Sequence, residues 1–114
     1  MILQSAHHRL TANNCAVILM DYQPQFALAI SSTDGGTLTG NAFNIAKVAT
    51  TFSIPTILTT VAETSFGGSL LPNLQEVFPD LKPIDRTTIN PWDDSRVLTG
   101  IEKAGRNKLV VAGL

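Results

Sequence analysis

Four short apolar runs alternate along the chain with segments in which apolar residues recur at helical spacing. The first run, 15–20, is continuous and stops at Asp21, which is typical of a strand buried on both faces. A second, β-branched run covers 55–61, and strand patterns follow at 81–86 and 108–112. Strands that alternate with helices predict a parallel sheet with right-handed crossovers.

The first helix is expected after a long loop. Residues 27–40 are rich in Ser, Thr and Gly, so we expect them to be irregular. Asn41 then caps a helix whose apolar side begins at Ala42 and reaches Phe52, and Pro55 stops it.

Two further helices are expected in the second half of the chain. One covers 71–78. The other starts at a cap formed by Asp93 or Asp94, runs through Ala104, and is closed by Gly105 in the left-handed conformation.

The composition adds limits on class and partners. The chain has 114 residues, 44% of them hydrophobic, which predicts one folded domain. A net charge of −1 leaves no basic excess for phosphates, so we expect no nucleic-acid partner. No apolar run reaches the roughly 20 residues that span a bilayer, so no membrane partner is expected. One cysteine and no recognisable signal peptide are typical of a cytoplasmic protein.

Candidate chemistry gathers where the predicted strands end. Ligands of open parallel sheets bind beyond the carboxyl ends of the strands, and Asp21, Glu63 and Arg86 fall there. A carboxylate that closes an apolar strand needs a cation beside it or else takes a proton. An arginine stays charged and anchors negative charge. From position alone, Asp21 is equally compatible with a helix cap or surface turn, and Arg86 with a surface arginine.

Other candidates favour structural roles. Cys15 lies about 20 Å from Asp21 along the same strand, at ~3.3 Å per residue, and is interpreted as a small buried hydrophobe. His7 and His8 are adjacent and point apart on an extended chain, which makes a poor metal pair. Phe66 and Trp92 either line an apolar pocket or cover the sheet edge. The chain has no phosphate-binding glycine fingerprint.

Four segments in order resemble the isochorismatase-like cysteine hydrolases. They are NCAVILMDYQPQF at 14–26, PTILTT at 55–60 followed by Glu63-Thr64, DRTTINPWDD at 85–94, and KAGRNKLVVAGL at 103–114. The resemblance implies a three-layer α/β/α sandwich with a mostly parallel, Rossmann-like sheet of about six strands. The 114 residues would then form a single, incomplete domain that is truncated after the fourth strand.

The resemblance also implies a reaction. Family members hydrolyse small amides or the vinyl ether of isochorismate with an Asp-Lys-Cys triad. Asp21 resembles the general base, and Arg86 occupies the position that usually holds lysine. The cysteine is expected shortly after the fourth strand, beyond Leu114.

Further site residues follow from the matching segments. Substrate contacts are expected from Gln23, Phe26, Glu63, Phe66, Asn90 and Trp92. Some relatives bind zinc through a second Asp and two histidines; the corresponding turn here, 23–25, lacks that Asp, so we expect no metal and no cofactor.

Two hypotheses remain open. The chain is part of a cysteine hydrolase for a small-molecule substrate, or it is an inactive family member that serves as an assembly protein. We expect a homo-oligomer in both cases, because relatives form multimers and a truncated sheet exposes an apolar edge. A phosphate-receiver domain is weaker, since the turn at Asp21 offers a single acid.

Overall fold

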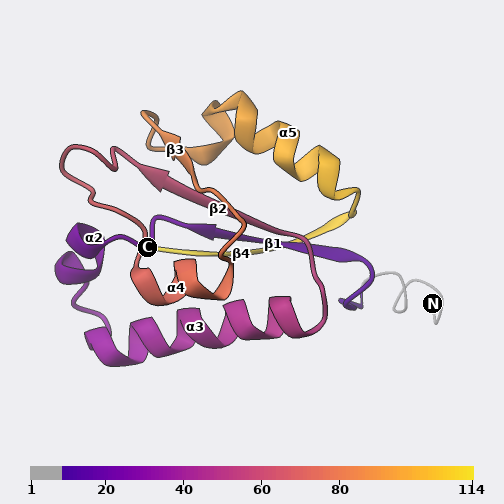
Figure 1. Ribbon diagram of the computed structural model, residues 1–114, viewed down its shortest axis with the longest axis horizontal. Helices are drawn as coiled ribbons and strands as arrows, with labels where there is room; N and C mark the ends of the chain where they lie inside the picture. Colours follow the sequence, from indigo (N-terminus) through magenta and orange to yellow (C-terminus); the bar gives the residue numbers. More distant parts are fainter. Residues whose placement is uncertain (1–8) are drawn as a thin grey trace.

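The computed structural model describes residues 9–114 as a parallel sheet with helices on both faces (Figure 1). The sheet has four strands in the order β3-β2-β1-β4, all mutually parallel. They are β1 (Cys15–Met20), β2 (Thr56–Val61), β3 (Ile84–Arg86) and β4 (Lys108–Gly113). The predicted parallel α/β fold is therefore confirmed. His7 and His8 lie outside the described residues.

The helices form the two outer layers. On one face lie α3 (Gly35–Thr51) and α4 (Pro72–Val77), with the short α2 (Pro24–Ala29) beside the start of α3 (Figure 1). On the other face lies α5 (Ser95–Ala104), preceded by a 3-10 turn, η1 (Pro91–Asp93). None of the helices in residues 9–114 has the length and apolar character needed to cross a membrane.

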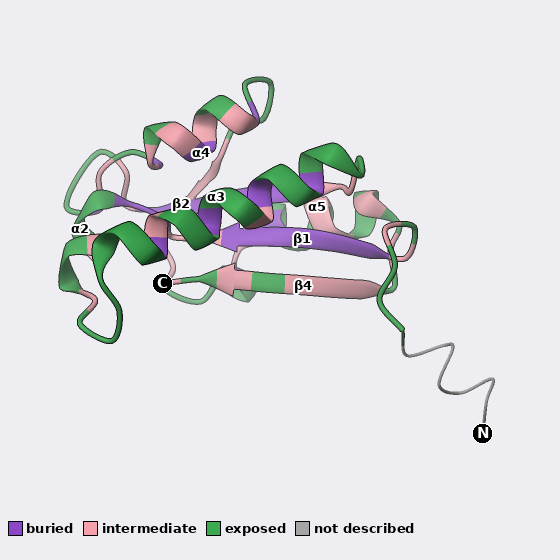
Figure 2. Ribbon diagram, turned by 90° about the horizontal axis from the view of Figure 1, so that it is seen from below, coloured by how far each residue is buried: buried purple, intermediate pink, exposed green. Residues whose placement is uncertain are grey.

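The sheet separates the hydrophobic core into two clusters. The larger cluster lies between the sheet and α3 and α4, and the smaller one, with Ile18, Ile57 and Val97, lies under α5. Strand β1 is buried along almost its whole length because it has a neighbour on each side, whereas the edge strand β4 is half-exposed (Figure 2).

The prediction of a loop over 27–40 is wrong. Pro24 sits in the first turn of α2, and α3 begins at Gly35 rather than after Asn41. The cap is Asp34, whose carboxylate accepts hydrogen bonds from the Thr37 N–H at 2.8 Å and the Thr37 hydroxyl at 2.7 Å. Burial of Leu38 against the core outweighs the low helix propensity of the glycines.

The remaining element boundaries are close to the predicted ones. Strand β3 is shorter than expected and begins after Pro83, which has no N–H to donate to a ladder. Asp94, not Asp93, caps α5 by accepting the Arg96 N–H at 2.9 Å. Gly105 ends α5 with φ +66°, as predicted.

Candidate active site

Two sharp turns place polar groups at the carboxyl edge of the sheet. Directly after β1, Asp21 has φ +62°, and directly after β2, Ala62 has φ +49°. Both residues are in the left-handed region, which non-glycine residues rarely adopt. Backbone hydrogen bonds hold them there: the Asp21 N–H donates to the Thr59 carbonyl and the Ala62 N–H to the Arg86 carbonyl, each at 2.9 Å. Such conformations persist where surrounding contacts impose them, which is common at functional sites.

The turn after β1 brings the Asp21 carboxylate to the Arg86 guanidinium. Nη1 of Arg86 donates to Oδ1 of Asp21 at 2.9 Å, and Nη2 to Oδ2 at 3.4 Å. The arginine side chain is fully buried, whereas 16% of the Asp21 side chain is exposed. The expectation that the two residues share one edge of the sheet is confirmed, and Arg86 is not a surface arginine.

The guanidinium uses all of its hydrogen-bond capacity. Its five N–H groups meet acceptors from five residues, namely both Asp21 oxygens, the Thr59 hydroxyl and the carbonyls of Thr60, Thr88 and Ile89. A buried cation needs this complete set because unpaired charge in the interior is costly. The contacts also fix the loop after β3.

Polar residues at the end of β2 complete the network and were missed at the level of sequence. The Thr59 hydroxyl donates to the Ile84 carbonyl at 2.7 Å while accepting from Arg86. Oδ1 of Asp85 accepts from the Thr60 hydroxyl at 2.9 Å and the Glu63 N–H at 3.1 Å. The available signal was a pair of hydroxyls in a strand with apolar neighbours, since buried polar groups need partners.

Gln23 joins the ends of β1 and β2. Its side chain is fully buried; Nε2 donates to the carbonyls of Val61 and Gly68, at 2.9 and 2.7 Å, and Oε1 accepts from the Val61 N–H at 2.9 Å. A Cβ at Gly67 would lie 2.3 Å from the Val61 carbonyl oxygen and 2.5 Å from Nε2, so only glycine fits there. These contacts give Gln23 a structural role, and its predicted contact with substrate stays a prediction.

The other predicted contact residues lie on the loops around this edge. Phe26 and Phe66 pack edge to face, with ring centroids 5.8 Å apart. Glu63 is half-buried and held through its backbone. Asn90 caps η1 by accepting the Trp92 N–H at 3.0 Å, and the Trp92 side chain is exposed. Their proposed roles toward a substrate stay predictions.

Three groups near this edge have shifted pKa values. The Arg96 side chain donates to the Asp94 carboxylate and, with the Arg96 N–H, holds the pKa of Asp94 below its usual value. The same hydrogen bond raises the pKa of Arg96. Burial raises the pKa of the Tyr22 phenol, because the charged phenolate loses its solvation there.

The opposite end of β1 is apolar. Cys15 is a free, buried cysteine with 2% of its surface exposed, as the sequence predicted. It lies among apolar side chains that include Val17, Val48 and Val110. In residues 9–114, no group of three or more His, Cys, Asp or Glu side chains is arranged to hold a metal ion.

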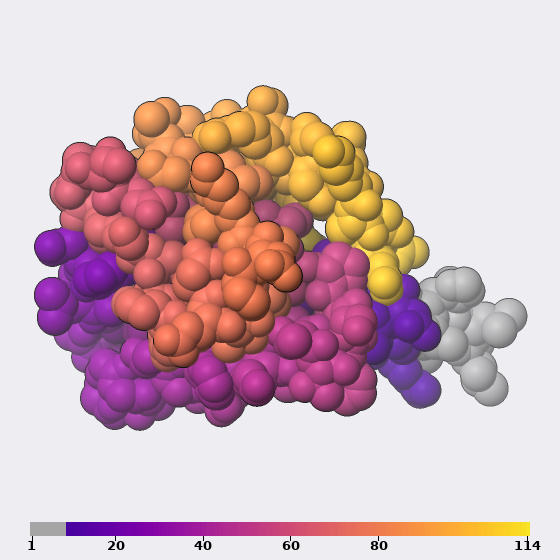
Figure 3. Space-filling view, viewed as in Figure 1, coloured from indigo at the N-terminus to yellow at the C-terminus, as the bar shows by residue number. Residues whose placement is uncertain are grey.

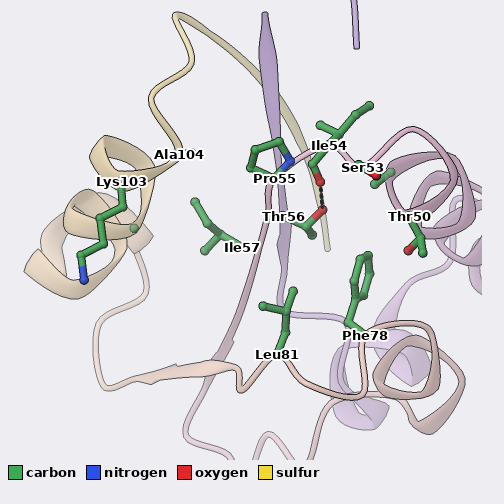
Figure 4. A pocket seen from close by; sticks show the side chains of 12 residues that line it. Thr50, Ser53, Ile54, Pro55, Thr56, Ile57, Phe78, Leu81, Lys103 and Ala104 are labelled. Atoms are coloured by element: carbon green, nitrogen blue, oxygen red, sulfur yellow. Dashed lines mark hydrogen bonds between the residues drawn. The ribbon is translucent and has the colours of Figure 1, made fainter. Parts of the chain in front are cut away.

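A cavity of about 490 Å³ is lined by neither Asp21 nor Arg86. Figure 3 shows a hollow between the orange and yellow parts of the surface. The cavity opens beside the first half of β2, because the short β3 pairs only with residues 59–61. Figure 4 shows Ile57, Phe78 and Leu81 around the hollow, which α5 borders through Lys103 and Ala104. None of the predicted site residues lines this cavity.

Fold and site together define a parallel α/β/α sandwich in which a buried guanidinium pairs with a partly exposed carboxylate, at the edge where such sheets bind ligands. No family model matches the chain. The chain is 34% identical over 107 residues to the probable hydrolase YcaC of Escherichia coli, a match that covers 93% of the chain and 51% of YcaC. The chain thus spans about half the length of the curated relative it matches.

Solved structures show the same similarity. The YcaC gene product of Escherichia coli, described as an octameric hydrolase of unknown specificity, superposes with a TM-score of 0.90 at 34% identity, over 94% of this chain and 53% of that one. YcaC from Pseudomonas aeruginosa, with hexane-2,5-diol and covalent acrylamide, gives 0.90 at 32% identity, over 95% and 54%. The MAR1 ribonuclease of Caenorhabditis elegans, at 22% identity, has a TM-score of 0.61 over 92% and 68%, a likeness of fold alone.

Proposed function

We propose that this chain belongs to a cysteine hydrolase of the isochorismatase-like type and supplies two of its three catalytic groups. Asp21 is the general base and Arg86 is the cation that holds it in place. The observation that carries the proposal is the 2.9 Å contact between these side chains at the carboxyl edge of the sheet. The substrate is a small amide-like or isochorismate-like molecule.

The geometry suits proton transfer from a thiol. Oδ2 of Asp21 has the longer contact with Arg86, 3.4 Å against 2.9 Å for Oδ1, so it is the oxygen freer to accept a proton. The thiol proton passes to this oxygen, and the thiolate attacks the substrate carbonyl carbon. The amine leaves with a proton, a thioester remains, and water releases the acid and regenerates the thiol. Arg86 keeps the carboxylate oriented throughout.

Cys15 does not supply this thiol. It lies at the other end of β1, about 20 Å from Asp21 by strand geometry, and is buried. It is also the one cysteine in the 114 residues. We therefore place the nucleophile on residues outside this sequence.

The similarity to YcaC supports the reaction class. The Escherichia coli relative is named a probable hydrolase, and the Pseudomonas aeruginosa structure holds covalent acrylamide. Acrylamide is an amide whose double bond adds to thiolates, so it resembles the substrate class and also reacts with the nucleophile that we propose.

An inactive assembly protein is the second candidate. It is favoured by the position of the single cysteine, which leaves Asp21 and Arg86 without a thiol in these 114 residues. We propose self-association for either function, because the Escherichia coli relative is octameric. Light scattering that shows a monomer would contradict this. A cytoplasmic location fits a free cysteine.

A fused protein tests the hydrolase proposal. The chain is joined after Leu114 to the part of Pseudomonas aeruginosa YcaC that it does not cover, and a panel of small amides is assayed. We expect turnover that falls at least about 100-fold in Asp21→Asn, because the general base is lost. Asp80→Asn is the matched control, because Asp80 is exposed and lies near the opposite edge of the sheet. We expect this variant to keep full activity. Equal turnover in both variants would remove Asp21 from the mechanism, and no turnover in the unaltered fusion favours the assembly protein.

A further inference from the structure

We infer that the site selects neutral or cationic amides with an apolar body and rejects substrates that carry a carboxylate, including isochorismate-like ones. The inference rests on the proposed function for the location of the site. The resemblance leaves two substrate classes open, amide-like and isochorismate-like molecules, and only the amide-like class fits this selectivity.

Groups on this chain already occupy the guanidinium of Arg86. Every N–H of its guanidinium already meets an acceptor on this chain, and its charge is opposed by Asp21 at 2.9 Å. A substrate carboxylate would have to displace Asp21 or the carbonyls of Thr88 and Ile89 to reach it. The cation therefore serves the general base and offers nothing to an incoming anion.

The segments that follow the strands at this edge are acidic. Directly after β1, β2 and β3 come residues 21–23, 62–71 and 87–94, which contain four carboxylates and no lysine or arginine. The next cation along the chain is Arg96 at the start of α5, and Asp94 neutralises it at 2.7 Å. An anion bound here would lose water and gain no partner from these segments, while facing like charge.

The same segments also expose apolar side chains. Phe66 and Ile89 are 56% and 78% exposed, and Trp92 also reaches solvent. Phe66 is fixed by its edge-to-face contact with Phe26, and the carbonyl of Ile89 is fixed by Arg86. Burying an apolar substrate body against these side chains is favourable, at roughly 25 cal/mol per Å².

Three probes of the same shape test the inference. Benzamide, benzoate and benzamidine share a ring and a planar head group and differ in charge. Each is titrated into the isotope-labelled chain while the backbone amide resonances of the non-proline residues in 21–26, 62–68 and 87–92 are followed by NMR. We expect benzamide and benzamidine to shift these resonances and benzoate to bind at least about tenfold more weakly than benzamide. Benzoate binding as tightly as benzamide, or no shift with any probe, would overturn the inference.

Two variants sharpen the test. Asp21→Asn removes the charge that neutralises Arg86, so benzoate affinity is expected to rise until it equals or exceeds that of benzamide. Glu63→Gln leaves the Asp21–Arg86 pair intact and is expected to weaken benzamidine alone. Asp80→Asn is the control, with unchanged ratios. Unchanged ratios in both Asp21→Asn and Glu63→Gln would contradict the inference.

The binding test is separate from catalysis. If the fused protein hydrolyses amides but benzoate binds best, the inference fails and the proposed function stands. If benzamide is preferred but the fused protein is inactive, the selectivity stands and the hydrolase proposal fails.

Discussion

The two ends of β1 are both shielded from water, but by opposite means. At its amino end, the buried Cys15 thiol lies beside mostly apolar side chains and forms no ion pair within residues 9–114. At its carboxyl end, Asp21 meets Arg86, and the contacts of Thr59, Thr60 and the loop carbonyls fill the space around the guanidinium.

The difference shows what burial demands of each group. A thiol is a weak hydrogen-bond donor and is buried as a small hydrophobe without a partner. A guanidinium is buried only when each N–H has a hydrogen-bond acceptor and a negative charge lies beside it. A saturated polar network therefore marks the end of β1 at which we propose the chemistry, whereas the thiol at the other end contributes to the core.

Removing the guanidinium is expected to have the largest effect. Arg86→Met leaves the Asp21 carboxylate and several carbonyls without their partner, so we expect a loss of about 3–5 kcal/mol in the free energy of unfolding. Urea denaturation measures it. Arg9→Met, at an exposed arginine outside the network, is the control with an unchanged midpoint. A loss below about 1 kcal/mol for Arg86→Met would mean that the network does not stabilise the carboxyl end.

Adding one methyl group at the carboxyl end is expected to have the next largest effect. In Gly67→Ala the new Cβ meets the Val61 carbonyl and the Gln23 amide at 2.3 and 2.5 Å, which forces the loop to move. We expect a loss of about 1–3 kcal/mol in thermal or urea denaturation. Gly40→Ala, in α3, is the matched control: the new Cβ would meet no atom of residues 9–114 within 4 Å beyond its own stretch of helix, so we expect the free energy of unfolding to rise by up to about 1 kcal/mol. Effects of the same sign in both variants would contradict the close approach.

The amino end of β1 is expected to tolerate change better. Cys15→Ala removes a buried sulfur that forms no hydrogen bond or ion pair in the described residues, so we expect a loss of about 1 kcal/mol. The thiol should react with a disulfide reagent more than about tenfold more slowly in the folded chain than in urea. Fast labelling of the folded chain would show an accessible, reactive thiol and would reverse the comparison of the two ends.

The smallest expected effect is a change in pH dependence next to Asp21. Burial raises the pKa of Tyr22 above 10.0, so the folded state holds the phenol proton more tightly than the unfolded state. This contribution is complete below pH 10.0 and is lost as pH rises through the folded pKa. Tyr22→Phe should therefore lose less stability between neutral and alkaline pH than the unaltered chain.

Tyr22 is the one tyrosine in the sequence, so phenolate absorbance reports its titration directly. A midpoint at or below 10.0 in the folded chain would contradict burial of the phenol.

The sheet was predictable because its strands are short apolar runs bounded by polar residues. The apolar pattern at 15–20 predicted both ends of β1, and Gly105 predicted the end of α5. The start of α3 was not predictable from apolar spacing, because glycines at 35, 36 and 40 resemble a loop until Leu38 is seen to pack against the core. Tertiary burial overrides local propensity there.

The candidate site was predictable only in its main pair. Asp21 and Arg86 follow from the rule that ligands meet the carboxyl ends of parallel strands, since both residues end strands. The contacts of Gln23 were not predictable. They connect Gln23 to Val61 and Gly68, which lie 38 and 45 positions further along the chain, and the path of the loop between them depends on Gly67. The saturation of Arg86 likewise depends on carbonyls from the loop at 88–89.

The most direct test of the account is where acrylamide attaches in the fused protein that carries the remaining part of Pseudomonas aeruginosa YcaC. We predict an adduct on a residue that the YcaC part supplies, formed at a rate that falls at least about 100-fold in Asp21→Asn, with Cys15 unmodified by peptide mass spectrometry. An adduct on Cys15, or an adduct that forms equally fast without the Asp21 carboxylate, would contradict the account.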